Sequence, residues 1–529
     1  MTEVKTIKSY VYGRWYEAES GFVPITNPST EEVIARVSSD GVDFSSVLEF
    51  ARQQGASSLQ AMTFAQRAGL LKEMSKVLRE HRDELLELSR LNNGTTKMDG
   101  AFDIDGASGT LAYYASIGRG LGERNVLIEG ERVQLSRGGS FAGQHIYIPR
   151  QGIAVHINAF NFPAWSFAEK AACSLLAGMP VVTKPASATA LVAERCVELI
   201  IGAQILPEGA VQLVSGSLGD LLDGLGPKDV VAFTGSAETA GLVRAQLDSQ
   251  SVNARFNVEA DSLNAAVLGP DVAPDSATME LFVRDVVREM TQKAGQKCTA
   301  VRRVIVPSST VAEVQEALAT RLEETVVGDP ADESVTMGPL ATFDQLESAE
   351  EGVAALSPGT TIVAGTGRRV EGVGATPGRG YFFAPTLIRV DKSSDKSSIH
   401  RREIFAPVAS LISYDGEAQQ AADLNSLAGG TLVTSIYTDD AGWVERFVLG
   451  GGATTGRLYL GSADSSKEAP GSGVALPQSL HGGPGRAGGG EELGGLIGVK
   501  LYLQRVALQG APALLDSVET GTSKDGSGR

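Results

Sequence analysis

The order of hydrophobic and polar positions changes along the chain. From about residue 43 to 93, apolar residues recur at three- and four-residue spacing, which is typical of amphipathic helices. Between about 145 and 270, short apolar runs alternate with longer helical patterns. The expected strands are 152–158, 181–184, 211–214, 230–233 and 254–258, and the expected helices are 164–176, 188–201 and 238–247. This alternation predicts a parallel sheet with helices on both faces.

A second α/β unit is expected after residue 264. Its expected strands are 265–268, 301–306, 404–414 and 432–437, and its expected helices are 279–291 and 311–324. Residues 355–380 and the glycine-rich stretch 471–498 are predicted to be mostly loop, and 520–529 a solvated tail. The chain is therefore predicted to contain two successive α/β units.

Composition narrows the function classes. The chain has 529 residues, enough for about three structural units, and a formal net charge of −17. An acidic protein is a poor binder of nucleic acid or of anionic lipid. No apolar run of membrane-spanning length occurs, and the first residues hold no hydrophobic signal core. A cytoplasmic protein without nucleic-acid or membrane partners is expected.

Three cysteines occur, and only one is expected to be reactive. Their spacing fits neither a disulfide framework nor a zinc site, so no metal is expected. Cys173 and Cys196 lie on apolar faces of predicted helices and are expected to be buried. Cys298 follows a helix in a polar, glycine-containing turn beside Lys297. There we expect an accessible thiolate, stabilised by the neighbouring ammonium group.

Polar residues follow several predicted strands. Asn161 and Lys184 come at or after two strand ends, and Gly235 with Ser236 lies between a strand and a helix. Because the carboxyl ends of parallel strands line one crevice, these residues are expected to meet around one ligand. Gly235 and Ser236 would offer free backbone N–H groups to an anion. Glu259 ends another strand and is either a general base or a solvated acid.

A glycine motif at 483–488 is the obvious candidate for a dinucleotide fingerprint. It matches G-x-G-x-x-G. No predicted strand precedes it and no predicted helix opens at it, and both are needed for that motif to hold a pyrophosphate. The usual Rossmann fingerprint is therefore not supported.

In combination, these motifs resemble the aldehyde dehydrogenase superfamily in order and spacing, from about residue 27 to 505. The matching motifs are Asn161-Phe162-Pro163, Lys184-Pro185, Phe233-Thr234-Gly235-Ser236, Glu259, Gly295-Gln296-x-Cys298 and Glu403-Ile404-Phe405-x-Pro407. The resemblance implies the α/β fold of that family and a homodimer. It implies a Rossmann-like cofactor domain at 1–130 and 151–264, a catalytic domain at 265–490, a small β oligomerisation element at 131–150 and 491–512, and a tail at 513–529.

The same resemblance implies a reaction and its catalytic residues. Cys298 would be the nucleophile, Glu259 the general base and Asn161 the oxyanion-hole donor, while Glu492 aligns with an acid that assists a proton relay. An aldehyde would be oxidised to a carboxylic acid through a cysteine thiohemiacetal and a thioester. Glu259 is present in a stretch that departs from the usual pattern of the family, since Asp261 stands where most relatives have glycine.

The cofactor is expected to be NADP, with NAD used less well. By resemblance, Lys184 and Glu403 would contact the cofactor riboses, Phe405 would pack near the nicotinamide, and Gly235 and Ser236 would hold phosphate. Many NAD-preferring relatives carry glutamate where this chain has Ser187. A neutral hydroxyl removes the repulsion of a 2′-phosphate and leaves Lys184 free to pair with it.

Local stretches resemble one subgroup of the family. Residues 258–264, 291–298 and 481–488 are similar to the aldehyde dehydrogenase domain of bifunctional ring-opening enzymes of phenylacetate degradation. Only 19 residues follow Gly510, so no hydratase domain is expected. Similarity to stand-alone members acting in aerobic benzoate degradation implies oxidation of 3,4-dehydroadipyl-CoA semialdehyde. The alternatives are a CoA-acylating enzyme, another semialdehyde dehydrogenase, and a catalytically silent binding relative.

Overall fold

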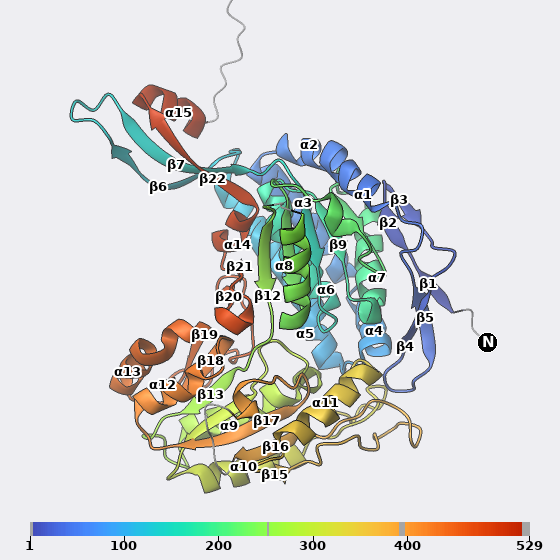
Figure 1. Ribbon diagram of the computed structural model, residues 1–529, viewed down its shortest axis with the longest axis vertical. Helices are drawn as coiled ribbons and strands as arrows, with labels where there is room; N and C mark the ends of the chain where they lie inside the picture. The colour runs from blue at the N-terminus through green and yellow to red at the C-terminus, as the bar shows by residue number, and fades with distance from the viewer. Residues whose placement is uncertain (1–3, 251–252, 391–396, 521–529) are drawn as a thin grey trace, which may run out of the picture.

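Two seven-stranded sheets, each covered by helices, form most of the molecule. The computed structural model describes residues 4–250, 253–390 and 397–520 (Figure 1). In Figure 1 the first unit occupies the upper right, the second lies below it, and a ribbon of long strands projects at the upper left. The predicted α/β class is confirmed, and the two units are built from the two stretches in which strands and helices alternate.

The first sheet has the order β12-β11-β8-β9-β10-β2-β3, and its first five strands run parallel. Its strands are β2 Ser9–Val11, β3 Arg14–Tyr16, β8 Ala154–Ile157, β9 Val181–Lys184, β10 Val211–Leu213, β11 Val230–Thr234 and β12 Arg255–Glu259. Its helices are α6 Pro163–Ala177, α7 Ala190–Gly202 and α8 Ala237–Ser249. Every residue of α6 is buried, which explains why its sequence is mostly apolar, with Glu169 and Lys170 as its charged exceptions.

The second sheet has the order β15-β16-β17-β14-β13-β18-β19 and is parallel except at β15. Its strands are β13 Ala265–Leu268, β14 Arg303–Pro307, β15 Thr360–Ala364, β16 Thr386–Val390, β17 Val408–Tyr414, β18 Thr431–Tyr437 and β19 Thr455–Gly461. Its helices are α9 Ala277–Thr291, α10 Val311–Glu323, α11 Phe343–Leu356, α12 Ala418–Ser426 and α13 Ala441–Gly451. Residues 404–407, predicted as strand, form a loop that carries the candidate site residue Phe405, and Glu403 directly precedes it.

Five helical segments precede the first sheet's parallel strands. They are α1 Phe44–Phe50, α2 Ser57–Gln60, α3 Phe64–Glu80, α4 Arg82–Asn93 and α5 Lys97–Leu121. Helix α5 was not expected, because its five glycines favour loops. Packing explains it: a Cβ added at Gly118 would lie 2.4 Å from Leu176 of α6, so the missing side chain lets the two helices approach closely.

Two smaller sheets and a short ribbon complete the fold. One sheet joins β1 Lys5–Ile7, β4 Val23–Thr26 and β5 Val33–Val37, and the projecting one joins β6 Leu127–Gln134, β7 Ala142–Pro149 and β22 Leu503–Gly510. The ribbon pairs β20 Leu480–Gly482 with β21 Glu491–Leu493, before α14 Leu496–Leu501. Part of the expected tail is helical, as α15 Pro512–Thr520, and 521–529 lie outside the described residues. No described helix is long and apolar enough to span a membrane.

Candidate active site

Cys298 lies in a loop whose backbone is forced into an unusual shape. Helix α9 ends at Thr291, and the non-glycine residues Lys293 and Ala294 both have left-handed backbone angles, φ 54° and 51°. Such angles cost roughly 1–2 kcal/mol per residue. At Gly295 a Cβ would lie 2.5 Å from the carbonyl oxygen of Ala406. The loop before the cysteine is therefore held tightly against the loop that precedes β17.

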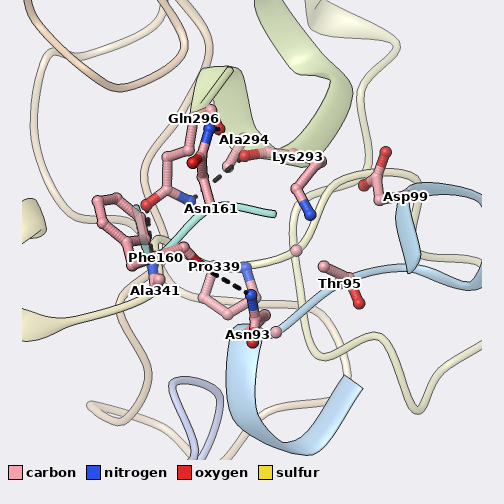
Figure 2. Close-up of a pocket in the computed structure, with 12 residues that line it drawn as sticks. Asn93, Thr95, Asp99, Phe160, Asn161, Lys293, Ala294, Gln296, Pro339 and Ala341 are labelled. Carbon is pink, nitrogen blue, oxygen red and sulfur yellow. Dashed lines mark hydrogen bonds between the residues drawn. The ribbon is translucent and has the colours of Figure 1, made fainter. Parts of the chain in front are cut away.

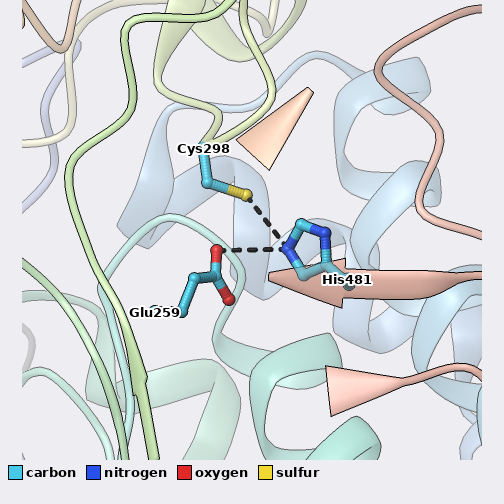
Figure 3. Close-up of side chains that lie close together, drawn as sticks. All are labelled: Glu259, Cys298 and His481. Atoms are coloured by element: carbon cyan, nitrogen blue, oxygen red, sulfur yellow. Dashed lines mark hydrogen bonds and ion pairs between the residues drawn. The ribbon is translucent and has the colours of Figure 1, made fainter. Parts of the chain in front are cut away.

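Three functional side chains from distant parts of the sequence meet at this loop (Figure 3). The Sγ atom of Cys298 lies 3.7 Å from Nε2 of His481, and the same nitrogen lies 3.1 Å from Oε1 of Glu259. Glu259 ends β12, and His481 lies on β20. Sequence reasoning placed Glu259 and Cys298 here but assigned no role to His481, although it lies in one of the stretches that carry the subgroup resemblance.

Burial and mutual charge shift the pKa values of all three groups. Burial, together with the neighbouring Glu259 charge, raises the pKa of the Cys298 thiol well above its ordinary value. Burial also opposes ionisation of Glu259, but His481 and Lys170 outweigh it and lower the pKa of that carboxyl to about 2. Burial disfavours a charged His481, yet Glu259 reverses this and the pKa of the imidazole is raised. The carboxylate is therefore ionised beside a thiol that resists ionisation.

Lys297 does not stabilise the thiolate, contrary to the sequence-based expectation. Its Nζ atom lies 2.5 Å from Oε2 of Glu289 and 2.7 Å from Oε1 of Gln292, and its side chain is fully buried. The backbone directs Lys297 toward α9, away from the sulfur of its neighbour Cys298. Because an ammonium group in an apolar interior needs a counter-charge, it pairs with the buried carboxylate.

Asn161 touches the nucleophile loop directly (Figure 2). Its Nδ2 donates a hydrogen bond to the backbone carbonyl of Gln296, at 3.0 Å, and the Gln296 side chain accepts from the N–H of Ala341, at 3.1 Å. An amide nitrogen carries two hydrogens, so one remains for another acceptor. Among the described residues, the backbone N–H of Cys298 has no acceptor. The two donors come from two loops, which the hydrogen bond from Asn161 to Gln296 holds together.

A second cluster of buried charges lies behind Glu259. Nζ of Lys170 lies 2.8 Å from Oε1 of Glu169 and 3.4 Å from Oε2 of Glu492, and oxygens of Glu169, Glu259 and Glu492 lie within 4.8 Å of one another. Burial raises the pKa of Glu169 to about 7, with Lys170 opposing the rise. Glu169 and Lys170 were missed, although two adjacent charged residues within the otherwise apolar helix α6 were a visible signal.

Lys184 and Ser187 lie at the carboxyl edge of the first sheet. Lys184 ends β9, burial lowers its pKa, and no described carboxylate pairs with its ammonium group. The hydroxyl of Ser187 donates to the carbonyl of Gly216, at 3.2 Å. A mostly buried cation without a protein counter-charge is suited to an anionic ligand, so these residues fit a phosphate-bearing cofactor.

The start of helix α8 is less open than expected. The N–H of Gly235 donates to the carbonyl of Glu259, at 3.2 Å, so it is not free; this part of the prediction is wrong. The Ser236 hydroxyl caps its own helix by accepting from Thr239 N–H, at 3.1 Å. Asp261 accepts from the N–H of Ala237, at 2.9 Å, and so places a carboxylate at the helix terminus. Among the described residues, the N–H groups of Ser236 and Glu238 are left without an acceptor.

Glu403 and Phe405 lie in the loop before β17. Glu403 accepts from the N–H of Ser262, at 2.9 Å, and pairs with Nε of Arg302, at 3.1 Å. The Phe405 ring meets Phe160 edge to face, with centroids 5.7 Å apart. Phe160 precedes Asn161, so the loop joins the second unit to the catalytic residues. Contacts of Glu403 and Phe405 with a cofactor stay predictions.

The fold and this group of side chains define a nicotinamide-dependent oxidoreductase with a cysteine at its centre. The model of the aldehyde dehydrogenase family matches residues 15–493, so the chain belongs to this family, whose members bind NAD or NADP, and it is an oxidoreductase acting on the aldehyde group. It is 41% identical over 478 residues to a 3,4-dehydroadipyl-CoA semialdehyde dehydrogenase of Aromatoleum evansii, covering 90% of this chain and 93% of that protein.

Two solved structures share the fold. Lactaldehyde dehydrogenase of Escherichia coli superposes with a TM-score of 0.83 at 23% identity, covering 96% of this chain and 99% of that one. Betaine aldehyde dehydrogenase of Staphylococcus aureus, in complex with NAD⁺, superposes with a TM-score of 0.81 at 23% identity, covering 95% and 94%. At this identity the likeness concerns the fold alone.

Proposed function

We propose that the protein oxidises an aldehyde to a carboxylic acid with NADP, through a thiohemiacetal and a thioester on Cys298. The observation that carries the proposal is that Glu259 meets Cys298 in one cluster, while Asn161, from a third segment, donates to the loop that carries Cys298. A structural role for any one of them would not require the other two beside it.

In the first half of the reaction, the sulfur of Cys298 attacks the aldehyde carbon after losing its proton. A C–S bond forms and the carbonyl electron pair moves to oxygen. The second hydrogen of the Asn161 amide and the backbone N–H of Cys298 hold that oxygen. Donors already aimed at developing charge are effective because nothing needs to reorganise during the step.

The cofactor, when bound, accepts the hydride that leaves the thiohemiacetal carbon. Lys184 would hold its adenosine ribose and 2′-phosphate, with Ser187 nearby as a neutral hydroxyl, and Glu403 would hold the second ribose. Support for NADP comes from the missing counter-charge of Lys184 and from the absence of a carboxylate at position 187. An acid there would repel the 2′-phosphate.

In the second half, Glu259 removes a proton from water, and the water oxygen attacks the thioester carbon. The C–S bond breaks, the acid is released, and the sulfur of Cys298 leaves as a thiolate that takes this proton back. Before Glu259 can act on water, it must pass on the proton that it received from Cys298. Glu169 and Glu492, bridged by Lys170, lie close enough to receive it. A pKa of Glu169 near 7 makes it a suitable acceptor at neutral pH.

As substrate we propose 3,4-dehydroadipyl-CoA semialdehyde. The relative with 41% identity bears that name. An apolar cavity lined in part by Phe102, Gly106 and Leu476 also includes Trp165, whose ring lies 6.1 Å from that of His481. The absence of a side chain at Gly106 of α5 leaves room in this cavity, which suits an unbranched hydrocarbon chain.

We propose that the protein is a homodimer joined through the projecting sheet of β6, β7 and β22. Val133, Leu135 and Phe141 are 57%, 46% and 42% exposed on or next to this sheet. Apolar side chains on a projecting ribbon favour burial against a second copy. The domain limits expected from the sequence, with 131–150 and 491–512 as the oligomerisation element, are part of this proposal.

The experiment is an assay of purified protein with semialdehydes that carry or lack the CoA moiety, each with NADP or NAD and without free CoA. We expect the CoA-linked semialdehyde and NADP to have the highest kcat/KM, and the acid as product. A requirement for free CoA would instead show an acylating enzyme. A clear advantage for NAD would contradict the cofactor assignment.

A further inference from the structure

His481 is the described side chain that the structure pairs with the reacting sulfur, and the reaction above leaves it without a role. It is 3% exposed and lies between Cys298 and Glu259. A structural histidine needs only one partner, and this one has two, both of which change charge during the proposed reaction. A structural role alone therefore does not explain why His481 lies between these two groups.

We propose that His481 is a catalytic residue whose single Nε2–H hydrogen bond is shared in turn between the carboxylate of Glu259 and the sulfur of Cys298. The inference rests on the proposed roles of Cys298 and Glu259. It adds a third member to the catalytic group, which stabilises whichever of the two anions is present.

The hydrogen-bond geometry supports this assignment. An ionised carboxylate oxygen only accepts hydrogen bonds, so at 3.1 Å the facing Nε2 of His481 must carry a proton. The sulfur lies within reach of the same N–H, at 3.7 Å. One N–H points well at only one acceptor at a time. The hydrogen bond passes from one acceptor to the other when the ring turns its N–H from Oε1 toward Sγ.

The proton balance of the first half-reaction uses this sharing. The S–H bond of Cys298 breaks and an O–H bond forms on Glu259, so the negative charge moves from oxygen to sulfur. The Nε2–H of His481 then turns from Oε1 to Sγ. Without this donor, the new carboxyl O–H of Glu259 would be the side-chain donor left to the thiolate in a buried site, and the charge on sulfur would be less well stabilised.

The second half-reaction reverses the pairing. Once the thioester has formed, the sulfur carries no charge, and Glu259 passes its proton toward Glu169 and Glu492. The carboxylate regains the hydrogen bond from His481 and can then deprotonate water. His481 neither gains nor loses a proton overall, and no further reactant is needed.

Other charged groups that face His481 are held by partners of their own. Glu169 and Lys170 of α6 form an ion pair with each other, and Glu492 of β21 accepts from Asn257, at 3.2 Å. Arg457 of β19 donates to the carbonyls of Val474 and Ser472. These groups set the local potential, but only His481 contacts both anions of the reaction.

The test is the pH dependence of alkylation of Cys298 by iodoacetamide in the full-length protein, followed by mass spectrometry of the Cys298 peptide. His481→Phe keeps a ring and removes the donor, and His481→Gln keeps a neutral N–H. The buried residues Cys173 and Cys196 serve as internal controls. We expect His481→Phe to slow alkylation at pH 7.5 by about tenfold or more, with the profile moved to higher pH, and His481→Gln to do so less.

Folding of each variant is checked by its melting temperature and by NADPH binding, which His481 does not contact in the proposal. An alkylation profile of folded His481→Phe that matches wild type, or a loss in His481→Gln as large as that in His481→Phe, would overturn the inference. Failure of the proposed function looks different: wild-type protein alkylated at Cys298 would then keep its activity, whatever the profiles of the His481 variants.

Discussion

The two halves of the candidate site handle charge in opposite ways. On the cofactor side, Lys184 keeps one ammonium group without a protein counter-charge, and Ser187 beside it is neutral. On the catalytic side, Glu169, Lys170, Glu259, His481 and Glu492 lie against one another in a buried cluster. The first arrangement leaves charge available to a ligand, and the second uses charge to change the chemistry of its own members.

The difference follows from what each half must do. A binding group gains most when its charge is satisfied only by the ligand, because any internal partner would have to be displaced first. A reacting group must instead exchange protons near neutral pH, so its pKa has to be shifted from the ordinary value by neighbours and burial. Mutations that add or remove charge should therefore affect binding on one side and rate on the other.

The sharpest way to separate the halves is Cys298→Ala. We expect turnover to fall by about 10⁴-fold or more, because the covalent route is lost, while NADPH affinity changes less than about twofold. Steady-state kinetics and a fluorescence titration measure the two. Cys196→Ala, at a fully buried cysteine of α7, is the matched control and should keep its activity. Substantial turnover by the Cys298 variant would remove the nucleophile assignment.

Glu259→Gln should separate the two steps of the catalytic half, which are formation of the thioester and its hydrolysis. We expect kcat to fall by about 10²–10⁴-fold, because water is no longer activated, and the thioester to accumulate. Intact mass after mixing with substrate and NADP measures the adduct. Glu238→Gln, an exposed acid in the first turn of α8, is the control. Unimpaired turnover without any adduct would exclude the role as base.

Ser187→Glu should disturb only the cofactor half. A carboxylate beside the 2′-phosphate repels it, so kcat/KM for NADP should fall by about tenfold or more while the value for NAD changes little. Ser187→Ala removes the hydroxyl without adding charge and should keep the preference for NADP. Steady-state kinetics with both cofactors measure these kcat/KM values. An equal fall in kcat/KM for NADP and NAD would contradict the proposed position of the 2′-phosphate.

The smallest expected effect concerns pH. Burial raises the pKa of Glu169 to about 7, so below that pH it is protonated and cannot accept a proton from Glu259. The kcat of the wild type should therefore rise with pH through about 7. In Glu169→Gln this rise should disappear. Relative to wild type, kcat should be severalfold lower above pH 8 and nearly unchanged at pH 6. If kcat of Glu169→Gln still rises with pH near 7, the group that titrates there is not Glu169.

Predictions from local pattern were accurate where burial is uniform and weak where tertiary contacts override propensity. Strand β9 was placed from its apolar run, with the bounds that the structure has. Helix α5 was not predicted, and two of its glycines, Gly106 and Gly118, lie against α6, a tertiary contact that the local pattern does not show. Lys297 was placed beside the sulfur because it is next to Cys298 in sequence, yet adjacent side chains point in different directions.

The sequence by itself determined the fold class, the family and the residues able to carry the chemistry, since periodic burial and ordered motifs are local properties of the chain. Only the tertiary structure decided which of those residues touch. It brought His481 between Cys298 and Glu259, turned Lys297 away, filled the start of α8 with Asp261, and gathered Glu169 and Glu492 around Lys170. Proton affinities depend on distance and burial in space, which spacing along the chain does not specify.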